Sequence, residues 1–260
     1  MKVLFWWIIF ALSFLTFNAS GQEIKSKKLD ISIGVGLSVP IASYAKKDPS
    51  KSAIYIIDAP LPSVKGFDKG KSGFAKTGFD YNFEIKYKLS NSLRFLLRTG
   101  TYSNSVETQG MSEFLTHLFG DREIRVEEGD YSFLYITPGI GYNYSLIKFD
   151  FGLDLLMGYS RTNYPYYKFV LLFTTVNPPI IFAHDGPQPD LGAFTVCTSL
   201  SATYKLFNQL RVGMILSFQN VNFSYNVSPR SIPGGSTSFD YSDILKVRVL
   251  NTGIKIGYGF

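Results

Sequence analysis

The sequence has little of what metal-bound, disulfide-bonded or nucleic-acid-binding proteins require. One cysteine and two histidines leave too few ligands for a structural zinc site or a disulfide framework. Charged residues make up only 18% of the chain, and the net charge of +6 is spread along it, which gives nucleic-acid binding little support. The 16% aromatic content argues against disorder. We therefore expect a folded chain with no metal ion, no other cofactor and no nucleic-acid partner.

Long hydrophobic runs are also scarce, and the one near the N-terminus is short. Met1 and Lys2 precede an apolar run from Val3 to Phe17, which falls short of the roughly 20 residues that a transmembrane helix needs. The small residues Ala19-Ser20-Gly21 then suit signal peptidase. We predict a signal peptide over residues 1–21 and an exported mature chain over 22–260; the alternative is an uncleaved anchor helix.

Strict alternation of apolar and polar residues dominates the mature chain. Between Thr77 and Leu89, for example, every odd position from Phe79 onward is aromatic or aliphatic and every even one is polar. Such a pattern predicts strands with one apolar face. The predicted strands are Leu29–Val39, Thr77–Leu89, one starting at Leu93, Tyr131–Tyr144, Ile147–Tyr159, Leu191–Tyr204, one starting at Leu210, and one ending at Phe260. Near residues 246–249 the phase is lost, which predicts a bulge.

The predicted connections alternate in length. Short ones fall near residues 90–92, 145–146 and 205–209, and long ones near 40–76, 104–130, 161–189 and 223–243. This pattern predicts an all-β fold, an eight-stranded antiparallel transmembrane β-barrel with short periplasmic turns and long extracellular loops. A soluble secreted β-protein is the alternative, because a lipocalin-like barrel also alternates.

The composition of the polar face favours the membrane barrel. In the first and last strands this face carries mainly Gly, Ser and Asn, which suit the crowded interior of a small barrel. Elsewhere it carries charges of both signs, which would neutralise one another inside. Aromatic residues at strand ends would form the periplasmic girdle: Tyr87, Tyr142, Tyr144, Phe149, Tyr204, Tyr258 and Phe260.

Three segments carry a family resemblance: Gly34 to Pro40, Gly73 to Phe79, and Asn251 to Phe260. With them the chain resembles the small outer-membrane β-barrels of Bacteroidota, which include the PorT-like barrels, and more distantly OmpA- and OmpX-type barrels. The resemblance implies residence in outer-membrane lipid of a bacterial cell. It also implies recognition by the barrel-assembly machinery through a C-terminal signal that contains Gly253, Ile256, Tyr258 and Phe260. PorT-like barrels are associated with the type IX secretion apparatus, so an accessory role there is one alternative.

Two predicted long loops are unusually apolar. Residues 111–119 have helical periodicity, which predicts a short amphipathic helix that rests on the outer leaflet or a partner, or packs on its own loops. The loop near residues 161–189 is expected either to contact a partner or ligand or to fold back over the barrel mouth. The candidate partner or lipid contacts are Phe169, Leu171, Phe173, Ile181, Phe182, Phe114 and Leu118. The first long loop is basic (Lys65, Lys69, Lys71, Lys76) and is expected to be solvated or to meet lipopolysaccharide phosphates.

Catalytic chemistry receives little support. His184-Asp185 is the one local His–acid pair, and no nucleophile motif accompanies it, so we predict no catalytic residues. We expect a non-enzymatic barrel with a structural or interaction role, whose long loops contact a partner, lipid or surface. The alternatives are a narrow pore or transporter of small apolar molecules, and the secretion accessory named above.

Overall fold

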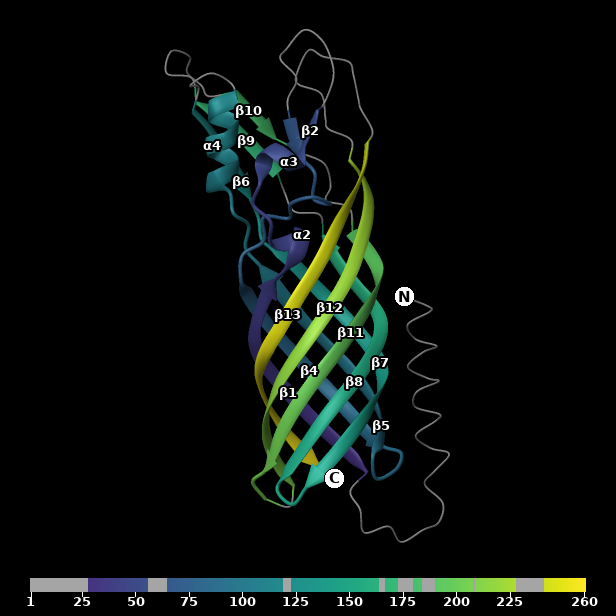
Figure 1. Cartoon of the computed structure of the whole chain (residues 1–260). Helices are drawn as coiled ribbons and strands as arrows, with labels where there is room; N and C mark the ends of the chain where they lie inside the picture. The colour runs from purple at the N-terminus through teal and green to yellow at the C-terminus, as the bar shows by residue number, and fades with distance from the viewer. Residues whose placement is uncertain are drawn as a thin grey trace.

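The computed structural model describes residues 28–55, 65–118, 123–163, 167–172, 180–183, 190–207, 209–227 and 241–260. Most of them belong to one closed antiparallel barrel (Figure 1). Its strands are β1 (Leu29–Pro40), β4 (Gly78–Lys88), β5 (Leu93–Asn104), β7 (Tyr131–Leu146), β8 (Phe149–Asn163), β11 (Asp190–Lys205), β12 (Leu210–Val227) and β13 (Tyr241–Gly259). Each strand pairs with its neighbour along the chain, and β13 pairs with β1. The predicted eight-stranded barrel is thereby confirmed.

The ring closes through two glycines that face one another. Gly36 of β1 pairs with Gly253 of β13. A Cβ atom added to Gly36 would lie 2.1 Å from the Thr252 carbonyl oxygen, and one added to Gly253 would lie 2.4 Å from the Val35 carbonyl oxygen. The two backbones therefore approach more closely at this seam than any side chain would allow.

The connections differ at the two ends of the barrel. At one end, next to the C-terminus, neighbouring strands are joined by residues 89–92, 147–148 and 206–209 (Figure 1). At the other end the loops carry structure of their own: α2 (Ala42–Ala45), α3 (Pro49–Ser52), β2 (Ala53–Tyr55), β3 (Lys65–Phe67), α4 (Gln109–Leu118), β6 (Glu123–Glu128), β9 (Tyr167–Leu172) and β10 (Ile180–Ala183). We call the half near the short turns the lower barrel and the other half the upper barrel.

The two halves have opposite polarity. In β12, the buried side chains change from Ser217 and Gln219 in the lower barrel to Val221, Phe223 and Tyr225 in the upper. The outward side chains change in the opposite sense along the same strand: Met214, Leu216 and Phe218 are followed by Asn222, Ser224 and Asn226. The lower barrel is thus apolar outside and polar inside, and the upper barrel has an apolar core and an outer face that is mainly polar, with Ile244 of β13 as an exposed exception.

This inversion, and no bulge, explains the lost phase near residues 246–249. The pairing of β13 with β12 is continuous from Tyr241 to Tyr258. Leu245, Val247 and Val249 lie on the inward face together with Asn251 and Lys255. The pleat keeps its period of two along the whole strand, and only the apolar face changes sides. The predicted bulge was wrong, and both β12 and β13 extend into what the sequence suggested was a long loop.

Candidate functional site

The outer surface of the lower barrel is almost entirely apolar. On β8, five successive outward positions from Phe149 to Met157 are large hydrophobic residues with more than 40% of their surface exposed. Ile254 and Ile256 of β13 are 55% and 48% exposed. An exposed apolar belt of this extent is unfavourable in water and matches the band that a transmembrane barrel presents to lipid. No helix in the described part of the chain is long and apolar enough to cross a membrane.

Aromatic residues border this belt at its lower edge. Tyr142, Tyr144 and Phe149 lie outside the barrel near the short turns and are about half exposed. Phe149 contacts Tyr204, with ring centroids 5.1 Å apart, and Tyr258 contacts Phe260 at 4.8 Å. Rings at this depth can keep an apolar body in lipid and a polar edge in the interface. These residues of the predicted girdle therefore lie together near the short turns, and that this edge is periplasmic stays a prediction.

Inside the lower barrel, ion pairs fill the lumen. Glu84 of β4 accepts two hydrogen bonds from Arg98 of β5, at 3.0 Å from Nε and 2.6 Å from Nη2. Lys86 Nζ lies 2.5 Å from the other oxygen of Glu84, and Lys255 Nζ lies 3.6 Å from it. Since Glu84 and Arg98 are both almost fully buried, each depends on the other for its compensation.

A second carboxylate continues this network across the lumen. Asp154 of β8 accepts from Arg94 Nη2 at 2.5 Å and from the Ser199 hydroxyl at 3.1 Å. Arg98 Nη2 also donates to the Ser199 oxygen at 3.0 Å. Side chains from strands on opposite sides of the ring are thus joined through its centre. We call these residues (Glu84, Lys86, Arg94, Arg98, Asp154, Ser199 and Lys255) the lumen network.

The first long loop is inserted into the mouth of the upper barrel. Tyr44, Phe67 and Phe74 are buried in one cluster with barrel residues such as Phe133 and Phe223. Tyr44 contacts Tyr131 with centroids 5.3 Å apart, and Phe133 stacks on Tyr102 at 4.6 Å. Phe74 adopts a left-handed φ of 54°, which burial of its ring compensates. The first long loop thus caps the described barrel. Much of the third long loop lies outside the described residues, so whether it contacts a partner or folds back over the mouth stays a prediction.

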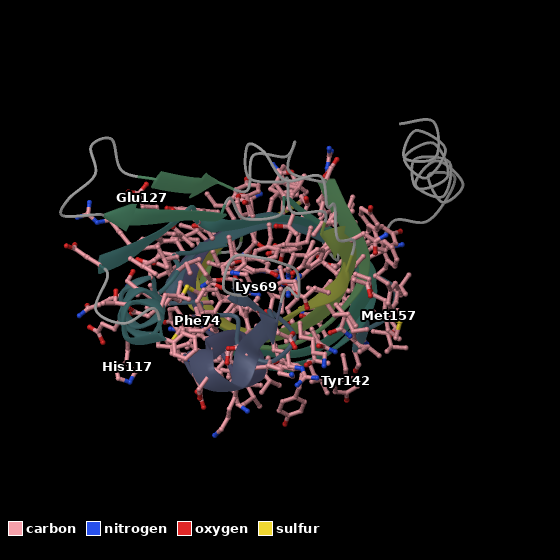
Figure 2. All side chains as sticks on the ribbon, turned by 90° about the horizontal axis from the view of Figure 1, so that it is seen from above. Lys69, Phe74, His117, Glu127, Tyr142 and Met157 are labelled. Atoms are coloured by element: carbon pink, nitrogen blue, oxygen red, sulfur yellow. The ribbon has the colours of Figure 1, made fainter. Side chains whose placement is uncertain are left out.

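A buried lysine helps to fix this cap. Lys69, expected to be solvated, is fully buried and its Nζ lies 5.4 Å from the centre of the Tyr131 ring. Its backbone N–H donates to Asp243 of β13, which also accepts from the Tyr225 hydroxyl. Burial raises the pKa of the Asp243 carboxyl above its ordinary value. From the loop end, Lys69 and Phe74 lie over the barrel interior, whereas Tyr142 and Met157 point away from it (Figure 2).

The second and third long loops together build a small layer beyond the barrel. Strands β6, β9 and β10 form an antiparallel sheet in the order β10-β9-β6, and α4 packs on β6 (Figure 1). Met111 and Leu115 of α4 are buried with Ile124 and Val126 of β6, and Phe114 packs against the same cluster. The Ser112 hydroxyl accepts from the Val126 backbone N–H at 2.9 Å. We call α4, β6, β9 and β10 the loop platform.

Six of the seven predicted contact residues belong to elements of this platform. The register places Phe169 opposite Val126 and Phe182, and Leu171 opposite Ile124 and Ile180. The apolar side of α4 faces β6, which agrees with the expected alternative of a helix that packs on its own loops. Phe173 lies outside the described residues, as do the side chains of Phe169, Leu171, Ile181, Phe182 and Leu118. Their role as contacts therefore stays a prediction.

Other predicted features are placed only in part. In the predicted assembly signal, Ile256 and Tyr258 point outward on β13, Phe260 follows the strand and is exposed, and Gly253 lies at the seam. The predicted signal peptide and His184-Asp185 lie outside the described residues. His117 is exposed on α4 and lies to one side of the barrel with Glu127 (Figure 2). Among the described residues, no group of three or more His, Cys, Asp or Glu side chains is arranged to hold a metal ion.

Comparison with known proteins gives no family. No protein-family model matches the chain, and no curated protein matches it either. Among solved structures, it is similar to Neisserial surface protein A at 10% identity, covering 90% of this chain and 98% of that one, with a TM-score of 0.43. Ail of Yersinia pestis is 11% identical over 90% of this chain and 99% of that one, with a TM-score of 0.40. The outer membrane protease OmpT of Escherichia coli is 11% identical over 93% of this chain and 99% of that one, with a TM-score of 0.42.

At these identities and scores the comparisons add no argument about activity. The class of the protein rests on its own geometry: a closed antiparallel ring of eight strands with an apolar outer belt.

Proposed function

We propose that this protein is a bacterial outer-membrane β-barrel that does not conduct, and that its role is to present the loop platform outside the cell. The apolar belt and the aromatic girdle support the membrane location. The short turns and the C-terminus would then face the periplasm, and the platform would face outward. The predicted signal peptide is consistent with export.

The filled lumen is the observation that carries this proposal. The lumen network crosses the lower barrel, and the aromatic cluster with its inserted loop fills the upper barrel. Opening a water-filled path would break buried ion pairs and expose a packed apolar core, and both changes are unfavourable. The described barrel is therefore built as a rigid support, and its elaborated loops are the part free to recognise a partner, lipid or surface.

Single-channel recording distinguishes this function from transport. The purified barrel in planar bilayers is expected to give no reproducible conductance steps. Steps that disappear when Arg98 or the lumen residues around it are substituted would overturn the proposal and support a narrow pore. Transport of small apolar molecules is tested by their uptake into vesicles that contain the barrel. We expect no uptake above that of vesicles without the protein, and uptake that depends on the barrel would overturn the proposal.

Recognition through the platform is tested by purification from native outer membranes in mild detergent. We expect a component that co-purifies with the wild-type protein and is lost from a variant that combines Phe169→Ser, Leu171→Ser and Phe173→Ser. A matched variant, Asn222→Ser with Asn226→Ser, changes the exposed outer wall of the upper barrel and should keep it. Equal recovery with all three proteins would contradict recognition by the platform.

The PorT-like resemblance leads to a separate test. If the protein is an accessory of a type IX-like secretion apparatus, a deletion strain should lose export of surface proteins. Normal export in that strain would dismiss the accessory role and leave the proposal above unchanged.

A further inference from the structure

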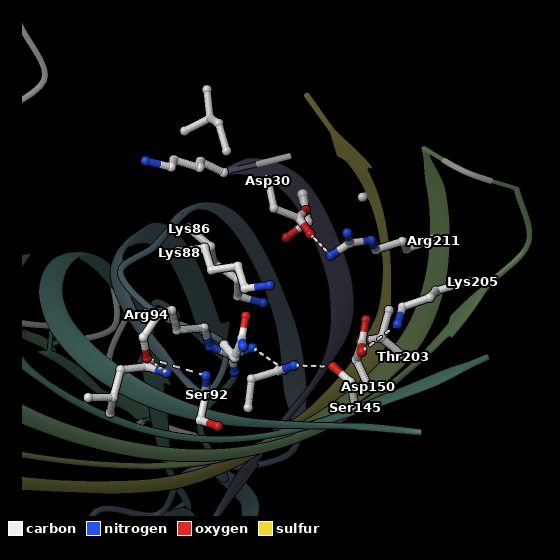
Figure 3. Close-up of a pocket in the computed structure, with 18 of the residues that line it drawn as sticks. Asp30, Lys86, Lys88, Ser92, Arg94, Ser145, Asp150, Thr203, Lys205 and Arg211 are labelled. Carbon is white, nitrogen blue, oxygen red and sulfur yellow. Dashed lines mark hydrogen bonds and ion pairs between the residues drawn. The ribbon is translucent and has the colours of Figure 1, made fainter. Parts of the chain in front are cut away.

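The lower end of the lumen contains a strongly basic cavity. It has a volume of about 150 Å³, which is room for on the order of ten water molecules. Seven of its lining residues are Lys or Arg, and only two are acidic. The cavity lies below the lumen network and is bordered by the turn at residues 89–92 (Figure 3).

The two acidic residues already have partners. Asp30 forms an ion pair with Arg211, and Asp150 Oδ1 lies 2.8 Å from Lys205 Nζ (Figure 3). Strand β1, which carries Asp30, pairs directly with β4, and the register sets Asp30 opposite Lys86. Lys86 and Lys88 extend from β4 into the same cavity (Figure 3). With Arg211 and Lys205 paired, five cations of the lining have no carboxylate partner among the residues that line the cavity.

Several of the remaining cations have no carboxylate of their own. Among the described residues, Lys28 and Lys88 have no acidic group within ion-pair distance. Lys255 is only 4% exposed and its Nζ makes no hydrogen bond in the described structure; its one ion pair, at 3.6 Å, is with Glu84. Glu84 is itself shared with Lys86 and Arg98. Arg98 also reaches Asp154, which pairs with Arg94. Two carboxylates therefore serve four cations, and positive charge is left over at the cavity floor.

Uncompensated positive charge inside a ring surrounded by lipid is unfavourable unless an anion or water enters. The cavity wall also holds hydroxyl and amide groups from Ser90, Asn91, Ser92 and Thr203. Phosphate oxygens accept strong hydrogen bonds from ammonium groups such as those that line this small cavity, and the hydroxyl and amide groups at its rim can donate further hydrogen bonds.

We propose that this cavity is a binding site for a phosphate-bearing anion that enters from the periplasmic end of the barrel. Lys88 and Lys255 are its two principal ligands, from β4 and β13. The site is separate from the loop platform, which lies at the other end of the molecule, so either can be present without the other.

The test is a titration of the refolded barrel with inorganic pyrophosphate in an uncharged detergent at low salt, followed by calorimetry. We expect saturable binding that Lys88→Gln weakens by about tenfold, because one unit charge near the anion is lost in a poorly screened site. Lys255→Met should weaken it at least as much. Lys148→Gln removes the same charge from an exposed turn at the same end and should leave the affinity within about twofold.

A second titration, with short-chain phosphatidylglycerol, separates free phosphate from a lipid headgroup. Binding of pyrophosphate assigns the cavity to free phosphate-bearing anions, and Lys88-dependent binding of the lipid alone assigns it to a headgroup. Absence of binding by both probes would overturn the proposal. Equal weakening by Lys88→Gln and Lys148→Gln would also overturn it, because the effect would then be general screening. Lys88 is only half-buried, so we expect Lys88→Gln to fold. The test therefore remains valid even if the buried Lys255 cannot be replaced without loss of the fold.

Discussion

The lower and upper barrel are made from the same strands, yet they follow opposite folding rules. In β12, the inward side chain of Gln219 is buried with polar partners. Four residues further along the same strand, the inward side chain of Phe223 is buried in an aromatic cluster. On the outward face of the same strand, Phe218 belongs to the apolar belt, whereas Asn222 is an exposed polar residue. In lipid the surroundings already accept apolar groups, so nothing drives those groups inward. In water the hydrophobic effect does so. The change of polarity therefore marks where the surroundings change.

The strongest test of the lower barrel is to remove its central carboxylate. Glu84→Gln leaves Arg98, Lys86 and Lys255 without their shared anion, and we expect it to lower the free energy of unfolding by about 3–5 kcal/mol. Guanidinium titration followed by far-ultraviolet circular dichroism measures this. Adding Arg98→Met should recover part of the loss, and a strictly additive double variant would show that the two residues are not coupled.

The upper barrel should respond most to loss of an aromatic ring. Phe133 contacts Tyr102, Tyr131 and Phe223, so Phe133→Ala is expected to cost about 3–5 kcal/mol through the cavity that it leaves. The matched variant Phe151→Ala, on the outward face of the lower barrel, should cost clearly less because lipid can fill the space. Equal losses in the same unfolding measurement would contradict the distinction between the two halves.

A charge on the outer wall locates the boundary between the halves. Leu153 lies in the middle of the apolar belt on β8. Leu153→Arg is expected to lower the free energy of unfolding in vesicles by about 2–4 kcal/mol. Asn222→Arg, exposed on the upper barrel, should change it by less than about 0.5 kcal/mol. A large effect at Asn222 would show that the belt extends higher than the polarity of the strands indicates.

The smallest expected effect concerns the loops above the upper barrel. Glu107 lies 3.1 Å from Lys76 and 3.5 Å from Lys47, and the hydrogen bond from Lys76 chiefly lowers the pKa of its carboxyl. A lowered folded-state pKa means that this contribution is present above the ordinary Glu value and is lost as the pH falls through the folded-state value. Glu107→Gln should therefore lower stability by less than about 1 kcal/mol at pH 7.

The same variant and the wild type should become equally stable at a pH well below the folded-state pKa of Glu107, where both side chains are neutral. Thermal unfolding at the two pH values checks this. A difference that persists at the lower pH would show that Glu107 acts through its shape or its neutral hydrogen bonds, and that charge is not the cause.

Much of the barrel could be predicted because lipid enforces one simple pattern in the lower half. Phe79 to Tyr87 of β4 alternates without interruption, and Phe149 to Tyr159 of β8 does so except at Leu156, which is buried inside the ring. Both strands were predicted to within a few residues. Where the strands leave the belt the same rule misleads. The buried Leu245, Val247 and Val249 looked like a shift of register, because alternation shows which residues share a face and does not show which face is inside.

The candidate site was predicted less completely. The charges of both signs on the polar face were predicted to lie inside, and the structure confirms this for Glu84, Arg94 and Asp154. Which of them meet could not be predicted, since Arg94 and Asp154 are far apart in the chain and their contact depends on the closure of the ring. The basic cavity was missed for the same reason: Lys28, Lys88 and Lys255 come together only where β1, β4 and β13 are neighbours.

The sequence by itself determined the eight strands and the alternation of long and short connections, because each depends on periodicity along one segment, and the composition of the polar face favoured an apolar outer belt. Only the tertiary structure decided that the first loop fills the barrel mouth, that the second and third loops share one sheet, and that polarity inverts halfway along the strands. Those features depend on contacts between distant segments and on which face of each strand closes inward, and no local pattern encodes either.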